Sequence, residues 1–413
     1  MKKKIYFTFA WLLTLLIAII WAYENSDKIS KLKDRLKIYK PKHEFVKEND
    51  DIDKDISVVE GNHFSLDVEK IISLDGKTSF LLNDSINREF NINDVDIFTQ
   101  EGFKINKDKT IKLELNKNFT DDFSGGLKTV FFINENVYGL TSSLAGECYY
   151  ASIVNLKTSD ELLKSNCLYG LEIDFNGLGS STIHIDNEIL ISIGTPTSSS
   201  NLINSYAQNK DFLFGKILSI QKNNLLSEKL SPKIYSMGHR NPQGITKIKK
   251  MIFSVEHGPK GGDELNKIIK NKNYGWPKVS YGTKYIFEKY NLDHEKNGYE
   301  EPIFAFVPSI GISSLNLCPS KLYNYYKKNC LIGLSLYGND LRPGKSLLIF
   351  LLDENLEKIH SIEKINLGKP LRHFMTNNKN EIFEDKDGHI YVSSDFDGIY
   401  RLNFNDFAKQ KVN

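Results

Sequence analysis

One segment of the chain gathers residue types that can bind an anion. The sequence GHRNPQG at 238–244 contains Arg240 together with Asn241 and Gln243. A guanidinium group pairs with a carboxylate through a planar fork of N–H donors, so Arg240 is a candidate anion clamp, and Arg372 further along the chain is a second one. The amide side chains of Asn241 and Gln243 can add neutral donors that fix the orientation of a ligand.

Two further segments follow closely. The segment EHGPKGGDELN at 256–266 contains Gly258 and Pro259, and NYGWP follows at 273–277. The backbone carbonyl oxygens of Gly258 and Pro259 would suit a hard cation such as Ca²⁺. The segment at 273–277 is interpreted as core and turn rather than as a contact with substrate.

Structural roles are open for several residues of these motifs. Arg240 could instead be a buried strut with a partner inside the protein. Asp263 and Glu264 could belong to a solvated turn or support the fold, and His239 and His257 are expected to orient the loops.

The body of the chain that must position these residues consists of short apolar runs separated by turn residues. Strand-favouring Ile, Val, Phe and Tyr dominate the runs, which predicts an all-β fold. Many short strands are typical of a sandwich pair, a barrel or a propeller, and no close repeat is visible at a fixed period. Clear examples lie at 129–133, 188–194, 247–258, 346–353 and 389–395.

The three motifs, in this order, resemble those of the soluble quinoprotein glucose and aldose sugar dehydrogenases, also called glucose/sorbosone dehydrogenases. The likeness covers roughly residues 90–405. The resemblance implies a six-bladed β-propeller with pyrroloquinoline quinone (PQQ) and calcium at the top of its channel. Weaker similarities lie at 213–218, 302–314, 371–374 and 387–392.

This resemblance assigns roles to individual residues. It implies that Arg240, Asn241, Gln243 and Arg372 contact PQQ, and that the carbonyl groups at 258–259 bind calcium. The cation would polarise the quinone carbonyl that accepts hydride. A family lysine that contacts the quinone is replaced by Tyr337.

The position of the family's general base departs from the pattern. In the family a histidine takes the proton of the sugar hydroxyl, and that position falls at Gly177 or Leu178, neither of which can accept a proton. His184 lies a few residues on and is a weak candidate substitute. An acidic partner is replaced by Thr195, and the first arginine of an R-x-R pair by Pro370. We therefore expect a divergent member of the family.

The first residues predict export. Lysines at 2–4 precede an uncharged apolar stretch at 5–23, which is close to the roughly 20 residues of a membrane-spanning helix. Residues 1–23 are interpreted as an uncleaved signal anchor or a cleaved signal peptide. On either interpretation the body lies outside the cytoplasm, periplasmic or extracytoplasmic, with the membrane contacted through the N-terminal helix.

Composition separates the next segment from the body. Residues 24–60 are densely charged and are interpreted as a stalk, which leaves 61–410 for the propeller. The whole chain carries 54 Lys and Arg against 52 Asp and Glu, so its charge gives no reason to expect a nucleic acid partner.

Cysteine usage agrees with export. Four cysteines allow three pairings, and the short separations favour Cys148 with Cys167 and Cys318 with Cys330. Four buried thiols are the alternative.

Three functions remain open. The first is a PQQ- and calcium-dependent oxidoreductase of aldose sugars or related alcohols, with an unknown electron acceptor. The second is a catalytically degenerate propeller that binds a glycan or a protein. The third is a calcium-dependent hydrolase such as a lactonase, which is ranked last because no cluster of acidic ligands is visible.

Overall fold

The computed structural model describes residues 42–45, 56–76, 78–83, 91–106, 109–133, 135–170, 173–197, 201–226, 230–284, 289–337 and 345–408. The predicted anchor at 1–23 and most of the predicted stalk lie outside these residues. Within the described part, no helix is long and apolar enough to cross a membrane.

The described strands form six antiparallel sheets, five of which are four-stranded meanders. The first of these consists of β4 (Ser79–Asn83), β5 (Val95–Thr99), β6 (Phe103–Asn106) and β7 (Lys109–Lys112). The second consists of β8 (Leu127–Ile133), β9 (Asn136–Ala145), β10 (Cys148–Asn155) and β11 (Glu161–Lys164). The third consists of β12 (Thr182–Ile185), β13 (Glu188–Ile193), β14 (Lys216–Gln221) and β15 (Lys233–Met237).

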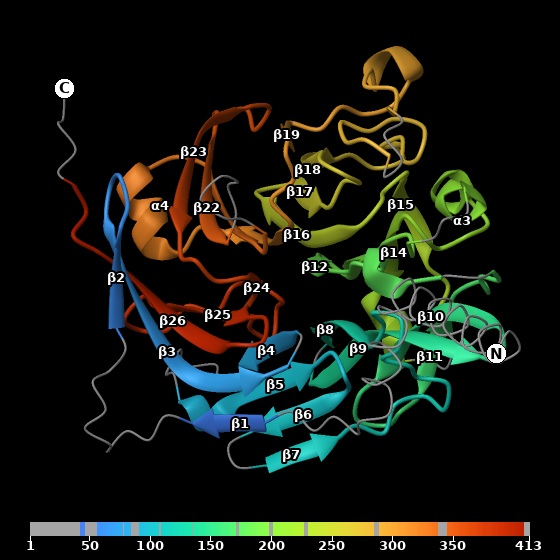
Figure 1. Ribbon diagram of the computed structural model, residues 1–413, viewed down its shortest axis with the longest axis horizontal. Helices are drawn as coiled ribbons and strands as arrows, with labels where there is room; N and C mark the ends of the chain where they lie inside the picture. Colours follow the sequence, from blue (N-terminus) through green and yellow to red (C-terminus); the bar gives the residue numbers. More distant parts are fainter. Residues whose placement is uncertain are drawn as a thin grey trace, which may run out of the picture. The chain divides into compact units, whose positions relative to one another are not determined.

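The fourth and fifth sheets repeat this meander (Figure 1). The fourth consists of β16 (Pro242–Ile248), β17 (Met251–Glu256), β18 (Asp263–Ile268) and β19 (Phe304–Phe306). The fifth consists of β20 (Ile312–Leu317), β21 (Cys330–Ser335), β22 (Ser346–Leu352) and β23 (Ile359–Asn366). Short helices lie between strands, namely η1 (Ile92–Asp94), η2 (Phe175–Gly177), α3 (Asn201–Ser205), η3 (Tyr206–Gln208), η4 (Lys222–Leu226), η5 (Glu295–Asn297) and α4 (Ser320–Tyr326).

The sixth sheet joins the two ends of the described chain. The early strand β3 (Ser65–Asp75) pairs with the late strand β26 (Gly398–Asn405), so blue and red strands lie side by side in Figure 1. The sheet continues through β25 (Ile390–Ser394) to β24 (Leu371–Phe374). This pairing closes the ring and removes two exposed sheet edges.

Two strands of the sixth sheet lie within residues 24–60, which were predicted to be a stalk. β1 (Lys42–Phe45) and β2 (Ile56–Glu60) both pair with β3, although they fall inside the segment interpreted as a linker. β2 has the sequence ISVVE, and the densely charged residues at 46–55 before it hide this short strand-favouring run.

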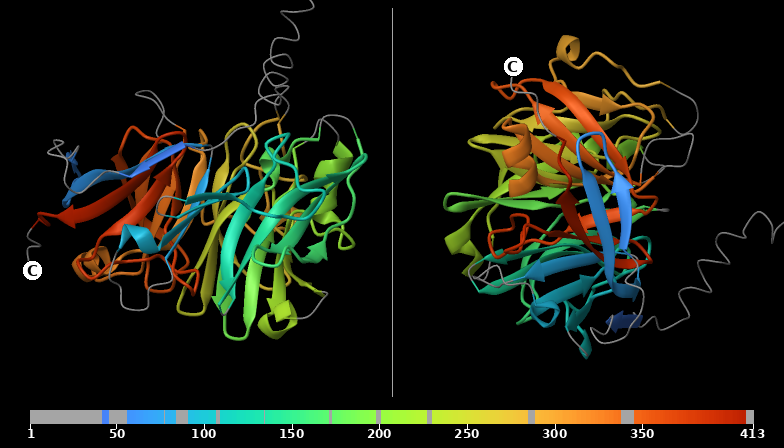
Figure 2. Two further views of the ribbon diagram at one scale, coloured as in Figure 1. Left: turned by 90° about the horizontal axis from the view of Figure 1, so that it is seen from below. Right: turned by 90° about the vertical axis from the view of Figure 1, so that its left-hand side faces the viewer.

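The core is divided into six apolar clusters, and each cluster fills the space between two neighbouring sheets. Figure 2 shows neighbouring sheets lying side by side. For example, Leu82 of β4 and Phe98 of β5 pack with Val130 and Phe132 of β8. Each sheet therefore buries both of its faces against its neighbours. The predicted six-bladed β-propeller is confirmed.

Both predicted disulfides are confirmed, since Cys148 pairs with Cys167 and Cys318 with Cys330 at separations of 19 and 12 residues. Each disulfide bond links two nearby segments of the chain within one sheet. The expected strands at 129–133, 188–194, 247–258, 346–353 and 389–395 correspond to β8, β13, β16 with β17, β22 and β25.

Candidate active site

The loop that carries Arg240 joins β15 to the inner strand β16. Gly238 begins the loop at a φ of 77°, and a Cβ there would lie 2.1 Å from Asn273 Oδ1. Only glycine is compatible with both the left-handed backbone and this close approach. The loop then directs Arg240, Asn241 and Gln243 into one cavity.

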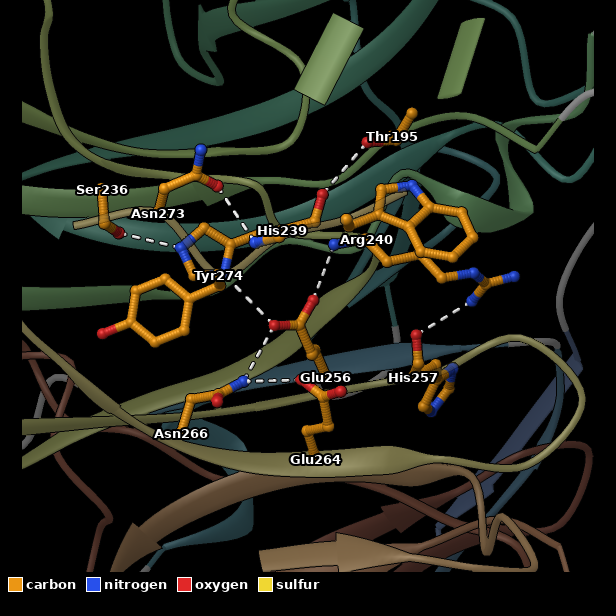
Figure 3. A network of polar contacts seen from close by, with 12 residues as sticks. Thr195, Ser236, His239, Arg240, Glu256, His257, Glu264, Asn266, Asn273 and Tyr274 are labelled. Atoms are coloured by element: carbon orange, nitrogen blue, oxygen red, sulfur yellow. Dashed lines mark hydrogen bonds and ion pairs between the residues drawn. The ribbon is translucent and has the colours of Figure 1, made fainter. Parts of the chain in front are cut away.

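The backbone of this loop is held by a buried network of polar contacts (Figure 3). His239 is fully buried; its Nε2 lies 2.8 Å from Ser236 Oγ and its Nδ1 lies 3.2 Å from Glu256 Oε1. The other oxygen of Glu256 accepts the backbone N–H of Arg240 at 2.7 Å. The expected loop-orienting role of His239 agrees with these contacts.

A second buried carboxyl group lies beside Glu256. Asn266 Nδ2 donates to Glu256 at 3.0 Å and to Glu264 at 3.2 Å. Burial opposes ionisation of Glu256, but hydrogen bonds from His239 and from the Arg240 loop outweigh it and lower the pKa of Glu256. Burial and the neighbouring Glu256 charge raise the pKa of Glu264 well above its ordinary value. The protonated form of Glu264 is therefore favoured, and its burial shows that it is not part of a solvated turn.

The cavity has a volume of about 390 Å³, within the range of small-molecule sites. Every residue proposed from the sequence to bind cofactor or metal lines it: Arg240, Asn241, Gln243, Gly258, Pro259, Tyr337 and Arg372. The structure thus brings together side chains that are up to 132 positions apart, from Arg240 to Arg372 (372 − 240).

The guanidinium of Arg240 keeps most of its donors open. Its Nη1 donates to the carbonyl oxygen of His257 at 2.9 Å, and the group lies 5.3 Å from the centre of the Trp276 ring. Among the described residues, no other acceptor takes a hydrogen bond from this side chain. The remaining donors can serve an anionic ligand in the cavity.

The guanidinium of Arg372, unlike that of Arg240, is paired with a carboxylate of the protein. Its Nε lies 3.0 Å from both carboxylate oxygens of Asp395, and its Nη2 also donates to Asp395. Burial raises the pKa of Asp395, while Arg372 acts in the opposite direction. Part of the guanidinium predicted to clamp the cofactor is thus already engaged by a carboxylate of the protein.

The two amide side chains form a chain of contacts. Gln243 Nε2 donates to Asn241 Oδ1 at 2.7 Å, and Asn241 Nδ2 donates to the carbonyl oxygen of Asn176 at 3.3 Å. The same Nδ2 lies 3.4 Å from His257 Nδ1. These contacts fix which edge of each amide faces the cavity.

The predicted calcium loop is anchored by Asp263, which is buried and accepts four backbone N–H groups. One comes from Gly258 at 3.1 Å. The other three come from Ile310, Gly311 and Ile312, at 3.1, 2.7 and 3.2 Å. The carboxylate therefore positions the loop, and in the described part of the chain no N–H group donates to the carbonyl oxygens at 258 and 259.

The resemblance predicts the family's base position at Gly177 or Leu178. A Cβ on Gly177 would lie 2.1 Å from the carbonyl oxygen of Thr195, so no larger residue fits there without rearrangement. Leu178 is buried and lines the cavity. His184 does not line it; its Nε2 lies 2.9 Å from the carbonyl oxygen of Phe132 and 2.9 Å from Asn380 Nδ2. Burial first, then Lys222, lowers the pKa of His184 to about 4.

Sequence reasoning did not single out three ionisable residues of the cavity, Lys128, His373 and Asp395. His373 follows Arg372 directly, and Asp395 ends a strand that the sequence did predict. Tyr337 lies at the mouth, where 64% of it is exposed.

A separate group of potential metal ligands does not coincide with the predicted calcium loop. Among the described residues, Asp385, Asp387 and His389 lie close enough together to share an ion. Asp385 already accepts from the backbone of Asp387 and His389 and from the side chains of His389 and Tyr391. These contacts account for the cluster as a structural turn.

Comparison with known proteins places this geometry in a family. Residues 144–401 match the sequence model of glucose/sorbosone dehydrogenase. Aldose sugar dehydrogenase YliI of Escherichia coli is 29% identical over 171 residues, 40% of this chain and 41% of that protein. Quinoprotein glucose dehydrogenase B of Acinetobacter calcoaceticus is 45% identical over 74 residues, 16% of this chain and 15% of that protein.

A solved structure supports the fold. The apo form of the soluble aldose sugar dehydrogenase from Escherichia coli superposes with a TM-score of 0.63 at 19% identity, over 82% of this chain and 99% of that one. The matches span about half or less of the length of the curated relatives. The family match nevertheless covers more than half of this chain, and the chain belongs to the glucose/sorbosone dehydrogenase family.

Proposed function

We propose that this protein is an extracytoplasmic oxidoreductase that uses PQQ and calcium to oxidise aldose sugars or related alcohols. Membership of the family and the names of its relatives support an oxidoreductase of sugars. The observation that carries the proposal is Arg240, whose guanidinium lines the cavity with most of its donors open.

The residues of the cavity fit PQQ, a planar molecule with three carboxylates and an ortho-quinone. The cavity is lined by three cationic side chains, Lys128, Arg240 and Arg372, and by two carboxylates, Asp263 and Asp395. In addition, the hydroxyl group of Ser309 is buried at the cavity without a partner in the described part of the chain. Such orphaned groups are uncommon in proteins and suit a polar ligand.

The fit of calcium rests on the backbone. Carbonyl oxygens at 258 and 259 are hard ligands, and Asp263 holds their loop without offering a spare oxygen. The cation would therefore depend on these carbonyl groups, on water and on the ligand itself.

When bound, PQQ supplies a quinone that accepts hydride. The chain's own part is to bind and to orient. Arg240 would hold an anionic oxygen, Asn241 and Gln243 would present fixed amide edges, and Tyr337 would shield one side of the mouth. Arg372 would contribute the donors that Asp395 does not engage.

We further propose that the body lies outside the cytoplasm and that residues 1–23 hold it at the membrane. The lysines that precede the apolar stretch support this orientation.

A second candidate is a degenerate propeller that binds a glycan or a protein. Leu178 favours it, because an apolar side chain stands where the family places its base. Losing a general base typically slows a reaction by about 10²–10⁴-fold.

Reconstitution distinguishes the two candidates. The protein, purified with both disulfides formed, is titrated with PQQ in the presence of Ca²⁺ while the quinone absorption is recorded. Saturable binding together with reduction of the quinone by an aldose supports the oxidoreductase. A folded protein that binds no PQQ refutes it and leaves the binding module.

A further inference from the structure

If the proposed oxidation takes place, some group must accept the proton of the substrate hydroxyl, and the cavity offers few candidates. Asp263 uses both carboxylate oxygens on backbone N–H groups. Asp395 is paired with Arg372 through both oxygens. Protonation of either carboxylate would weaken these bonds.

His257 is also unsuited. Its Nδ1 faces the amide nitrogen of Asn241 at 3.4 Å, and Asn241 has N–H donors to offer. Its Nε2 is buried away from solvent and has no partner among the described residues. The nitrogen of His257 without a partner, Nε2, is therefore shielded from solvent in the cofactor-free protein.

His373 faces the cavity because of an irregularity in its strand. In regular β-structure, successive side chains point to opposite faces, so Arg372 and His373 should diverge. The register of β24 against β25 shifts between Leu371 and Phe374, and both Arg372 and His373 line the same cavity. A bulge of this kind redirects side chains and often lies beside active sites.

The ring of His373 is fixed, yet its nitrogens are open. It stacks on Phe80 with ring centres 4.4 Å apart, and its backbone N–H donates to Ser393 Oγ at 3.2 Å. Within the described chain, neither ring nitrogen has a hydrogen-bond partner, and neither is among the polar atoms shielded from solvent.

We propose that His373 is the proton acceptor of this enzyme, in place of the histidine that the family carries at the position of Gly177 or Leu178. This inference rests on the proposed function. The substrate O–H bond breaks and its proton moves to an imidazole nitrogen of His373. The hydrogen on the same carbon leaves with its electron pair to the ortho-quinone, and the C–O bond becomes a carbonyl.

The surroundings of His373 keep it in the accepting form. Burial, followed by the positive charges of Arg372 and Lys128, lowers its pKa well below the ordinary value. No carboxylate is among the groups that act on it. A bound polyanion would offset the two cations and raise this pKa, which makes the imidazole a stronger base.

The first test needs no cofactor. Diethyl pyrocarbonate acylates unprotonated, accessible imidazole groups, and peptide mass spectrometry locates the adducts. His63 is exposed and should react, whereas His239 is buried with both nitrogens engaged and should not. We expect His373 to react at pH 6, and PQQ to protect it. A His373 as unreactive as His239 overturns the proposal.

The second test compares His373→Phe, which keeps the ring that stacks on Phe80 but has no nitrogen, with His184→Asn as a control outside the cavity. After reconstitution with PQQ and Ca²⁺, kcat for an aldose should fall about 10²–10⁴-fold in His373→Phe, with PQQ affinity unchanged. His373→Ala should regain activity with added imidazole. Binding of PQQ with an undiminished kcat in His373→Phe overturns this inference alone, whereas absence of PQQ binding in the wild-type chain overturns the proposed function as well.

Discussion

Replacing Arg240 separates a ligand-binding role from a structural one. In Arg240→Ala the backbone N–H that donates to Glu256 remains, so the network around His239 keeps its contacts. The side chain itself makes one hydrogen bond, to the carbonyl oxygen of His257, and one contact with the Trp276 ring. The first contributes about 1–2 kcal/mol and the second about 0.5–1 kcal/mol. We therefore expect the cofactor-free protein to lose only about 1.5–3 kcal/mol of stability.

The effect on the cofactor should be clearer. A charge-assisted contact with an anionic oxygen is worth about 1.5–3 kcal/mol, so PQQ affinity should fall about 10- to 150-fold in Arg240→Ala. Arg240→Lys should recover little of it, because an ammonium group cannot form the planar fork. Arg401→Ala is the matched control, since Arg401 pairs with Glu69 and does not line the cavity.

Two measurements check this prediction: urea unfolding of the cofactor-free variants, and titration with PQQ at a temperature where all of them are folded. The reasoning is refuted if Arg240→Ala unfolds far more easily while its PQQ titration matches that of the wild type. Arg240 would then be a structural strut, and the second candidate function would take precedence.

Three further changes test the structural part of the site. Arg372→Ala leaves Asp395 buried without its cation, so the free energy of unfolding measured in urea should fall by about 3–5 kcal/mol. The double variant Arg372→Ala/Asp395→Ala should recover most of this loss. If Arg372→Ala is as stable as the wild type, the pairing does not contribute to stability. The pKa of Glu264 is raised in the folded protein, so the folded state holds a proton that the unfolded chain releases above about pH 4.5. The wild-type protein therefore loses stability as the pH rises. Glu264→Gln should be more stable than the wild type at pH 8 but not at pH 4, and an equal gain at both pH values refutes the assignment. Lys216 donates from its buried Nζ to the carbonyl oxygens of Tyr206, Ala207 and Phe214, so Lys216→Met should lower stability by about 3 kcal/mol or more without changing PQQ affinity, as calorimetry and titration would check.

The strands and disulfides could be predicted because their signals are local. Runs such as the one that became β22 (Ser346–Leu352) are buried on both faces between neighbouring sheets and therefore read as continuous apolar segments. Cys318 and Cys330 pair across neighbouring strands, which a short separation already suggests. Closure of the ring could not be predicted in this way, because β3 and β26 come from opposite ends of the chain.

The candidate site was only partly predictable for the same reason. Arg372 was identified as an anion clamp, but its partner Asp395 lies across a hairpin, and their meeting depends on strand register. His373 could not be predicted as a residue of the site, because side chains alternate between the two faces of a regular strand and His373 would then point away from Arg372. The bulge that brings both side chains into one cavity leaves no mark in composition or periodicity.

The motif GHRNPQG contributes more to the fold than to the chemistry. Gly238 is required by the backbone, His239 is buried against Glu256, and the Arg240 main chain is fixed by Glu256 and Thr195. In the described part of the chain, Arg240, Asn241 and Gln243 are the side chains of the motif that line the cavity, and Arg240 keeps most of its donors open. A chain could therefore retain nearly the whole motif under selection for a stable propeller. Oxidation of a sugar would need Arg240 to hold the cofactor and a proton acceptor outside the motif, for which His373 is the proposed residue.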